Sequence, residues 1–146
     1  MTRRLSYDLH KLTVRLDRAA DRVLRHEMGT TYARFLALFA LSQGAQSQRE
    51  LAAWLGVTEP SASRMTAVLA ADGLLTVTRE PGTGNRRTLT LTQPGQKLAG
   101  ACGRLLEHRF ADLMERSGVP YGVYERHTQR LIAQIEADET PMARSA

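Results

Sequence analysis

Hydrophobic residues in the first part of the chain recur every three or four positions. Between Leu5 and about Arg25 the apolar positions are Leu5, Leu9, Leu12, Leu16, Ala19, Ala20 and Val23. This spacing predicts one apolar stripe along a long helix. The opposite face is basic, with Lys11, Arg18, Arg22 and Arg25. A narrow apolar stripe favours packing against another helix, which can be that of a partner chain.

A second helix is predicted from Tyr32 to Leu41. Thr31 is a suitable N-cap, and Gly44 follows where the helix must end. Because this segment is hydrophobic over most of its circumference, we expect it to lie in the core.

Two short helices follow, and their end signals are clear. Ser47 and Glu50 form a capping box before a helix that ends at Gly56. Thr58 then caps a helix that begins near Pro60 and ends at Asp72, before Gly73. Two short helices joined by so tight a turn predict a helix-turn-helix.

The second of these helices has two different faces. On a helical wheel the side chains expected to face the core are Ala62, Met65 and Leu69, with Val68 beside them. The outward positions are Pro60, Ser63, Arg64, Ala67 and Ala71. In a helix-turn-helix the second helix enters the DNA major groove, so these outward residues are candidates for contact with base edges.

A β-hairpin, here called the wing, is predicted next. Residues 74–79 are rich in β-branched side chains, residues 80–85 have turn chemistry, and residues 88–92 alternate strictly. Arginines bracket the glycine-rich tip at positions 79, 86 and 87. Positive charge on a projecting hairpin suits phosphate and minor-groove contact.

The rest of the chain predicts two more helices. Thr92 caps a helix from about Pro94 to Arg116, and Gly118 ends it. The last helix begins near Pro120, and we expect the tail from about Asp138 to be frayed. Apolar residues on the broad face of the first of these helices are Leu98, Cys102, Leu105, Leu106, Phe110 and Leu113, and Tyr124, Leu131 and Ile135 recur along the last one. The predicted fold is therefore mainly α with a small β-hairpin.

The net charge of the chain indicates which class of molecule it binds. The 146 residues carry a net charge of +5 and a pI of about 10, which favours a polyanion, either nucleic acid or an anionic membrane surface. No apolar run is long enough to span a bilayer, and the N-terminus lacks the pattern of a signal peptide. With one cysteine, Cys102, no intrachain disulfide is possible. We therefore expect a cytoplasmic protein with no membrane partner.

The helix-turn-helix and the wing together predict a surface for double-stranded DNA. Thr58 and Ser61, with the N-terminus of their helix, suit a backbone phosphate, whereas Arg64 can bind either guanine or phosphate. A merely solvated helix face is the alternative, and the wing arginines favour DNA. The predicted DNA-binding residues are Ser47, Thr58, Pro60, Ser61, Ser63, Arg64, Ala67, Arg79, Asn85, Arg86 and Arg87.

Other kinds of site are weakly supported. The four histidines, His10, His26, His108 and His127, lie in different predicted helices without metal-ligand spacing, although a cluster across a dimer stays open. We predict no catalytic residue, no metal and no cofactor. Cys102 and Trp54 are expected in the core. Tyr32, Phe35, Arg15 and His10 could line an effector pocket, but each also suits a core or interface position.

In this order the motifs resemble the MarR family of bacterial regulators. The segments that carry the resemblance are Gln48 to Ala52, Leu55 to Thr58, Ser61 to Arg64, Leu69 to Leu75, Asn85 to Arg87 and Leu91 to Gly95. The resemblance implies a triangular homodimer whose terminal helices interlock, with each protomer binding half of a near-palindromic operator. It also implies a repressor that responds to a small-molecule effector.

The same resemblance divides the chain into three regions. Residues 1–30 would be an N-terminal dimerisation helix, residues 31–92 the winged helix-turn-helix region, and residues 93–146 the C-terminal dimerisation helices. Two features depart from the family. Its wing commonly carries Asp-x-Arg, whereas this chain has Asn85-Arg86-Arg87, so Arg87 would be held differently, and the second wing strand is short. A winged helix used for protein contact, or for sequence-independent DNA binding, is the alternative function.

Overall fold

The computed structural model describes residues 3–82 and 86–143. The elements in chain order are α1 (Leu5–Met28), α2 (Tyr32–Ser42), α3 (Gln48–Leu55), α4 (Glu59–Ala71), β1 (Leu75–Arg79), β2 (Arg87–Leu91), α5 (Gln93–Ser117) and α6 (Tyr121–Ala143). They form two compact units, residues 1–106 and residues 107–146. The mainly helical fold with one hairpin is confirmed. No helix of the described part combines the length and the apolar character needed to cross a membrane.

Local signals explain where the helices of the first unit begin and end. The hydroxyl oxygens of Thr31, Ser47 and Thr58 each accept a backbone N–H three residues later, as expected of N-caps. The Glu50 carboxylate reaches back past the cap residue and accepts from the Gln46 N–H at 2.8 Å, so the reciprocal bond of the predicted capping box is shifted by one residue. Gly56 ends α3 at a φ of 65°, in the left-handed region that favours glycine.

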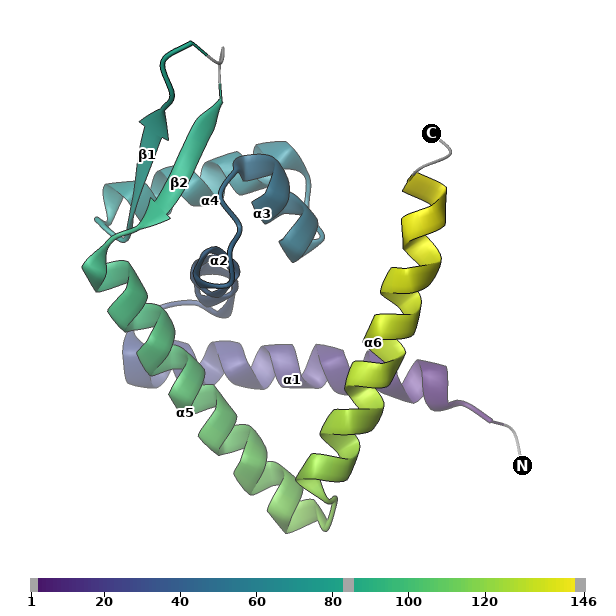
Figure 1. Ribbon diagram of the computed structural model, residues 1–146. Coiled ribbons are helices and arrows are strands. Elements are labelled where there is room, and N and C mark those ends of the chain that lie inside the picture. Colours follow the sequence, from purple (N-terminus) through teal and green to yellow (C-terminus); the bar gives the residue numbers. More distant parts are fainter. Residues whose placement is uncertain (1–2, 83–85, 144–146) are drawn as a thin grey trace. The chain divides into compact units, whose positions relative to one another are not determined.

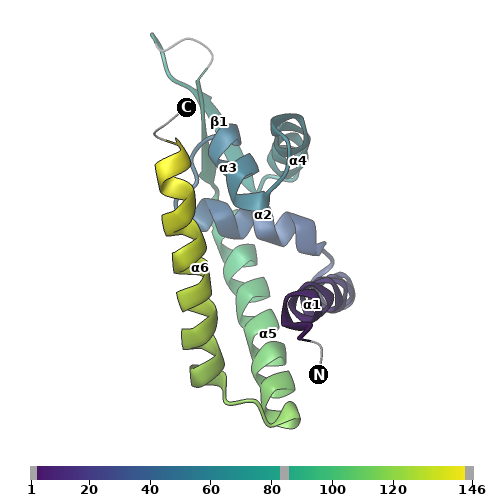
Figure 2. The same cartoon turned by 90° about the vertical axis from the view of Figure 1, so that its right-hand side faces the viewer.

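Helix α2 lies at the centre of the first unit. Figures 1 and 2 show it between α1 on one side and α3, α4 and the wing on the other. The main core cluster joins α2, α3, α4, the wing and α5 through Leu38, Leu51, Leu69, Leu75 and Leu89, with smaller residues between them. This burial of apolar surface fixes α3, α4 and the wing relative to one another.

A second cluster attaches α1 to this core. It consists of Leu24, Phe35 and Cys102, with Met28 and Tyr32 packed beside them. Cys102 has no exposed surface, so its expected place in the core is confirmed.

The wing is a two-stranded antiparallel hairpin. Leu75 pairs with Leu91, Val77 with Leu89 and Arg79 with Arg87. Directly opposed residues share one face of a hairpin. At the base this face is buried, with Leu75 and Leu89 in the core, and toward the tip the same face carries Arg79 and Arg87.

Three sequence-based expectations are wrong. Val68 and Trp54 are 40% and 56% exposed, because each lies more than 100° on the wheel from the centre of its helix's buried face. Thr66 takes the core position on α4, and its hydroxyl donates to the Ala62 carbonyl oxygen at 2.8 Å. The tail from Asp138 is helical as far as Ala143, although Thr140 and Pro141 are poor helix formers.

Candidate nucleic-acid interface

The outward face of α4 is small and polar. Pro60, Arg64 and Ala67 are exposed, and Ser63 is half-buried, whereas Ala62 and Leu69 on the other side have no exposed surface. The structure therefore places the predicted outward residues of α4 together on one accessible face. A face without large apolar groups can approach a base-pair surface closely.

A hydrogen-bond network organises the beginning of α4. The Ser61 N–H donates to Thr58 Oγ1 at 3.3 Å, and the Thr58 hydroxyl donates to Ser61 Oγ at 3.1 Å. Arg64 Nη2 also donates to Ser61 Oγ, at 3.0 Å. The guanidinium of Arg64 is thus held beside the first turn of the helix, where the backbone N–H groups carry partial positive charge. Because Ser61 Oγ accepts both bonds, its own hydrogen can be donated outward.

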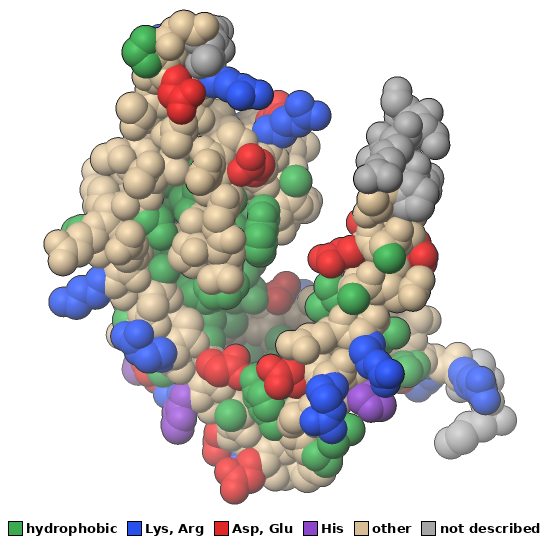
Figure 3. All heavy atoms as spheres, in the orientation of Figure 1, with side chains coloured by type: hydrophobic (Ala, Val, Ile, Leu, Met, Phe, Trp, Pro, Cys, Tyr) green, Lys and Arg blue, Asp and Glu red, His purple; other side chains and the backbone are tan. Residues whose placement is uncertain are grey.

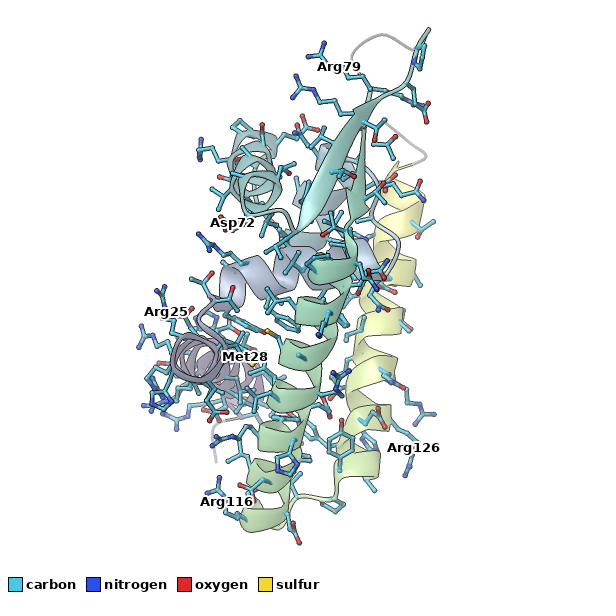
Figure 4. The ribbon with its side chains drawn as sticks, turned by 90° about the vertical axis from the view of Figure 1, so that its left-hand side faces the viewer. Arg25, Met28, Asp72, Arg79, Arg116 and Arg126 are labelled. Atoms are coloured by element: carbon cyan, nitrogen blue, oxygen red, sulfur yellow. The ribbon has the colours of Figure 1, made fainter. Side chains whose placement is uncertain are left out.

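The wing arginines line a groove beside the N-terminus of α3. This open groove of about 1060 Å³ is bordered by Gln46, Ser47, Gln48, Arg49, Glu50, Ala53, Glu59, Arg79, Glu80, Arg86, Arg87 and Thr88. Figure 3 shows basic and acidic side chains close together over the wing and α3, and Figure 4 shows Arg79 projecting from the wing. Arg79 and Arg87 lie directly opposite each other, and like charges in that position are destabilising unless an anion lies between them.

The groove adds one cation that the sequence reasoning missed. Arg49 lies in the first turn of α3 and lines the groove with the three wing arginines. Its position in the sequence, two residues after the N-cap Ser47, was the available signal. Ser47 also lines the groove, although its oxygen already accepts from the Glu50 N–H at 3.1 Å. Asn85 lies outside the described residues.

The residues considered for an effector pocket are not brought together. Tyr32 borders a hollow of about 440 Å³ between α1 and α2, with Asp17, Arg18, Asp21, Arg22 and Ala33. His10 and Arg15 line a different hollow on α1, and Phe35 is buried in the core. Burial and the nearby Asp17 carboxylate raise the pKa of the Tyr32 hydroxyl above its usual value. Tyr32 is therefore neutral at physiological pH.

Neither a metal site nor a reactive thiol is favoured. Within residues 3–82 and 86–143 no three or more His, Cys, Asp or Glu side chains are grouped so that they could hold a metal ion. Burial raises the pKa of the Cys102 thiol, which disfavours the reactive thiolate.

Comparisons with known proteins identify the fold and a family model that matches part of the chain. Residues 28–85 match the MarR family model. A search of curated proteins found no match. Three similar solved structures are a MepR–DNA complex from Staphylococcus aureus, wild-type MarR in its apo form from E. coli, and the regulator BldR from Sulfolobus solfataricus.

The structural similarity extends over most of each chain. For the MepR complex the identity is 20%, the coverage 93% of this chain and 99% of the other, and the TM-score 0.72. For MarR the identity is 19%, the coverage 92% of this chain and 98% of the other, and the TM-score 0.75. For BldR the identity is 19%, the coverage 88% of this chain and 93% of the other, and the TM-score 0.74. At such identities the similarity establishes the fold alone, and the family-model match is confined to the helix-turn-helix and the beginning of the wing. The chain therefore has the fold of these solved regulators, and its residues 28–85 match the MarR family model.

Proposed function

We propose that this protein is a sequence-specific regulator that binds double-stranded DNA as a homodimer. The observation that carries the proposal is the exposed outward face of α4, where Ser61 and Thr58 hold Arg64 beside the helix N-terminus. The wing, with its opposed arginines, is fixed to the same core. In this arrangement α4 enters the major groove and the wing contacts the adjacent backbone and minor groove.

The two parts of the surface have different tasks. On α4, Ser63 and Ala67 allow close approach to base edges, and Arg64 together with Ser61 and Thr58 binds a phosphate or a guanine at the groove edge. The wing groove brings together Arg49, Arg79, Arg86 and Arg87, which outnumber the three glutamates that also line it. This excess of positive charge supplies affinity that depends on salt but not on sequence.

The homodimer is supported by apolar side chains that remain exposed on the terminal helices. On α1, Leu5 is 69% exposed, and Leu9 and Leu12 also lie open to solvent. On α6, Leu131, Ile132 and Ile135 are each more than half exposed. Apolar stripes of this kind are covered in coiled-coil-like interfaces, and residues 1–30 and 93–146 are the proposed dimerisation regions, which flank the winged region of residues 31–92.

Ligand-responsive repression is the finer part of the proposal. The hollow bordered by Tyr32, Asp17 and Arg18 lies between α1 and α2, next to the link between the proposed dimerisation helix and the winged region. A small molecule that binds one arrangement of this link more tightly would shift the population of dimers away from the DNA-binding geometry. Titrating candidate ligands against the DNA complex in a gel shift tests this part separately.

The DNA-binding proposal is tested with the duplex upstream of the protein's own gene. Fluorescence anisotropy compares wild type with Arg64→Ala and Arg87→Ala, and Arg126→Ala on the exposed surface of α6 serves as the control of equal charge. Loss of a direct base or phosphate contact costs about 1–3 kcal/mol, so each test variant should bind roughly 5- to 150-fold more weakly. The control should bind like wild type.

The variants must also remain dimers, as measured by sedimentation. If Arg64→Ala and Arg87→Ala both bind the duplex like wild type, α4 and the wing are not the DNA-binding surface. If wild type shows salt-dependent binding with no preference between the upstream duplex and a random one, the protein is a sequence-independent DNA-binding module instead.

A further inference from the structure

A basic stripe lies on α1, about 120° around the helix from its exposed apolar residues. It consists of Lys11, Arg15, Arg18 and Arg22, all of which are exposed. The steps of four, three and four residues align them along one face over about 16 Å. Together with Tyr7, His10 and Val14 they border a shallow hollow of about 420 Å³.

Charges of this stripe are not neutralised within the chain. In the described residues no ion pair joins any of its four cations to a carboxylate. Asp17 and Asp21 border the stripe on the side of α2, but Asp21 is occupied, because it accepts from Arg25 Nε at 2.6 Å and from the Tyr32 N–H at 3.0 Å. The four aligned cations outnumber the neighbouring carboxylates of Asp8 and Asp17, which leaves a local positive potential that favours an anionic partner.

Neither the DNA-binding surface nor the dimer surface proposed above uses this stripe, although Arg18 and Arg22 also border the hollow proposed for a ligand. The exposed apolar residues of α1, Leu5, Leu9 and Leu12, lie about 120° around the helix from the stripe, so a dimer that covers only them leaves the basic side open. Helix α2 separates α1 from α4 and the wing (Figures 1 and 2). A straight duplex bound along α4 and the wing therefore does not pass over the basic stripe.

We propose that the α1 stripe is a second binding surface for duplex DNA, so that one dimer holds two duplex segments at once. Arginine suits phosphate oxygens because its planar fork can bind two of them, and three of the four cations are arginines. A line of cations matches the repeating negative charge of a DNA backbone. An anionic membrane fits less well, because an amphipathic helix binds a bilayer through its apolar face, which the dimer would cover.

Bridging of two duplexes is the direct test. The upstream duplex is fixed to beads and saturated with protein, and retention of a free, fluorescent, random-sequence duplex is then measured. The stripe variant is Arg15→Gln/Arg18→Gln/Arg22→Gln. Its matched control, Arg104→Gln/Arg126→Gln/Arg130→Gln, removes the same charge from exposed positions elsewhere.

Wild type and the control should retain the fluorescent duplex, and the stripe variant should retain at least about tenfold less. The salt dependence of this second binding event should fall by about one unit of slope for each arginine removed. The stripe variant should still bind the upstream duplex alone within about twofold of wild type. Conversely, Arg64→Ala/Arg87→Ala should bind the upstream and random duplexes equally, through the stripe.

Several results would overturn the second site. If the stripe variant retains as much fluorescent duplex as wild type, the stripe does not bind the second duplex. If the stripe variant and its matched control both lose retention, total charge rather than the stripe is responsible. A stripe variant that sediments as a monomer would place the stripe in the subunit interface. Stripe-dependent binding to phosphatidylglycerol vesicles without DNA bridging would assign it to a membrane. A failure of the DNA-binding surface proposed on α4 and the wing gives a different result, because wild type would then bind the upstream and random duplexes equally.

Discussion

Thr92 and Gly95 join the start of α5 to the segment that follows α4. The Thr92 hydroxyl donates to the Gly73 carbonyl oxygen at 2.7 Å, and the Thr92 N–H donates to the Leu74 carbonyl oxygen at 3.1 Å. The same Thr92 oxygen accepts from the Gly95 N–H at 3.2 Å. A side chain at Gly95 would collide with the Leu74 carbonyl oxygen, so the close approach of these two backbones requires glycine.

Replacing Gly95 should therefore destabilise the fold. We expect Gly95→Ala to lower the free energy of unfolding by about 1–3 kcal/mol, because the backbone of α5 must move away from Leu74. Gly100→Ala in the same helix is the control, since its new methyl group would meet only the flexible guanidinium of Arg104. That control should be neutral or more stable by up to about 1 kcal/mol. Equal urea-unfolding midpoints for the two variants would contradict this packing.

Most helix ends of the first unit were predictable because their signals are local. Thr31, Ser47 and Thr58 cap α2, α3 and α4 as expected, and Gly56 ends α3 in the left-handed conformation. Each signal depends on a few neighbouring residues, so no knowledge of tertiary packing is needed. The alternating residues of β2 and the turn chemistry before them located the wing in the same way.

Features that depend on distant neighbours were not predictable. Thr66 rather than Val68 packs inward on α4, because the position of α4 on the core, and not hydrophobicity alone, selects the buried face. Arg49 joins the wing arginines only because the α3 N-terminus lies beside the hairpin. Likewise, the carboxylate that accepts from the Tyr32 N–H at the start of α2 comes from Asp21, eleven residues earlier in α1.

Asp21 links α1 to α2 in a way that depends on pH. Hydrogen bonds from the Tyr32 N–H and the Arg25 guanidinium hold the pKa of its carboxyl group below the ordinary value of 3.8. Because the folded-state pKa is the lower one, this link stabilises the fold above about pH 4, and the stabilisation is lost as the pH falls through the folded-state pKa.

The variant Asp21→Asn tests this link. It should be less stable than wild type at pH 7, and the difference should shrink as the pH is lowered from about 4 toward 2. Urea unfolding followed by circular dichroism at a series of pH values measures the difference. A stability difference that stays constant across the acid range would show that the ionised carboxylate of Asp21 does not stabilise the fold.

The ion pair between Arg34 and Asp72 connects α2 to the end of α4. Arg34 Nη1 lies 3.3 Å from Asp72 Oδ2, and Asp72 is the C-cap of α4, where the helix dipole disfavours a negative charge. Figure 4 shows Asp72 at this end of α4. Arg34 therefore offsets an unfavourable charge at the end of the helix that we propose enters the major groove.

A double-mutant cycle measures this coupling. Because both side chains are partly exposed, Arg34→Ala should cost at most about 1 kcal/mol of stability in wild type. In the Asp72→Asn background the same substitution should cost less, leaving a coupling energy of a few tenths of a kcal/mol or more. Identical effects in both backgrounds would show that the pair does not support the end of α4.

On the scale of the whole molecule, the net charge of +5 is unevenly distributed. One group of arginines lines the wing groove beside α3, and another forms the α1 stripe on the other side of α2. Separately, Leu5, Leu9 and Leu12 of α1 are exposed, and in the second unit so are Leu131, Ile132 and Ile135 of α6. This division supports a dimer whose winged regions bind DNA and whose terminal helices join the protomers.

The most direct test of the DNA-binding account is a hydroxyl-radical footprint on the duplex upstream of the protein's own gene. Two winged regions related by a dimer axis should protect two half-sites in successive major grooves, about 34–36 Å apart. The Arg64→Ala variant should lose both protected regions at a protein concentration where Arg126→Ala retains them. Uniform protection along any duplex, or one unpaired protected region that does not depend on Arg64, would contradict the account.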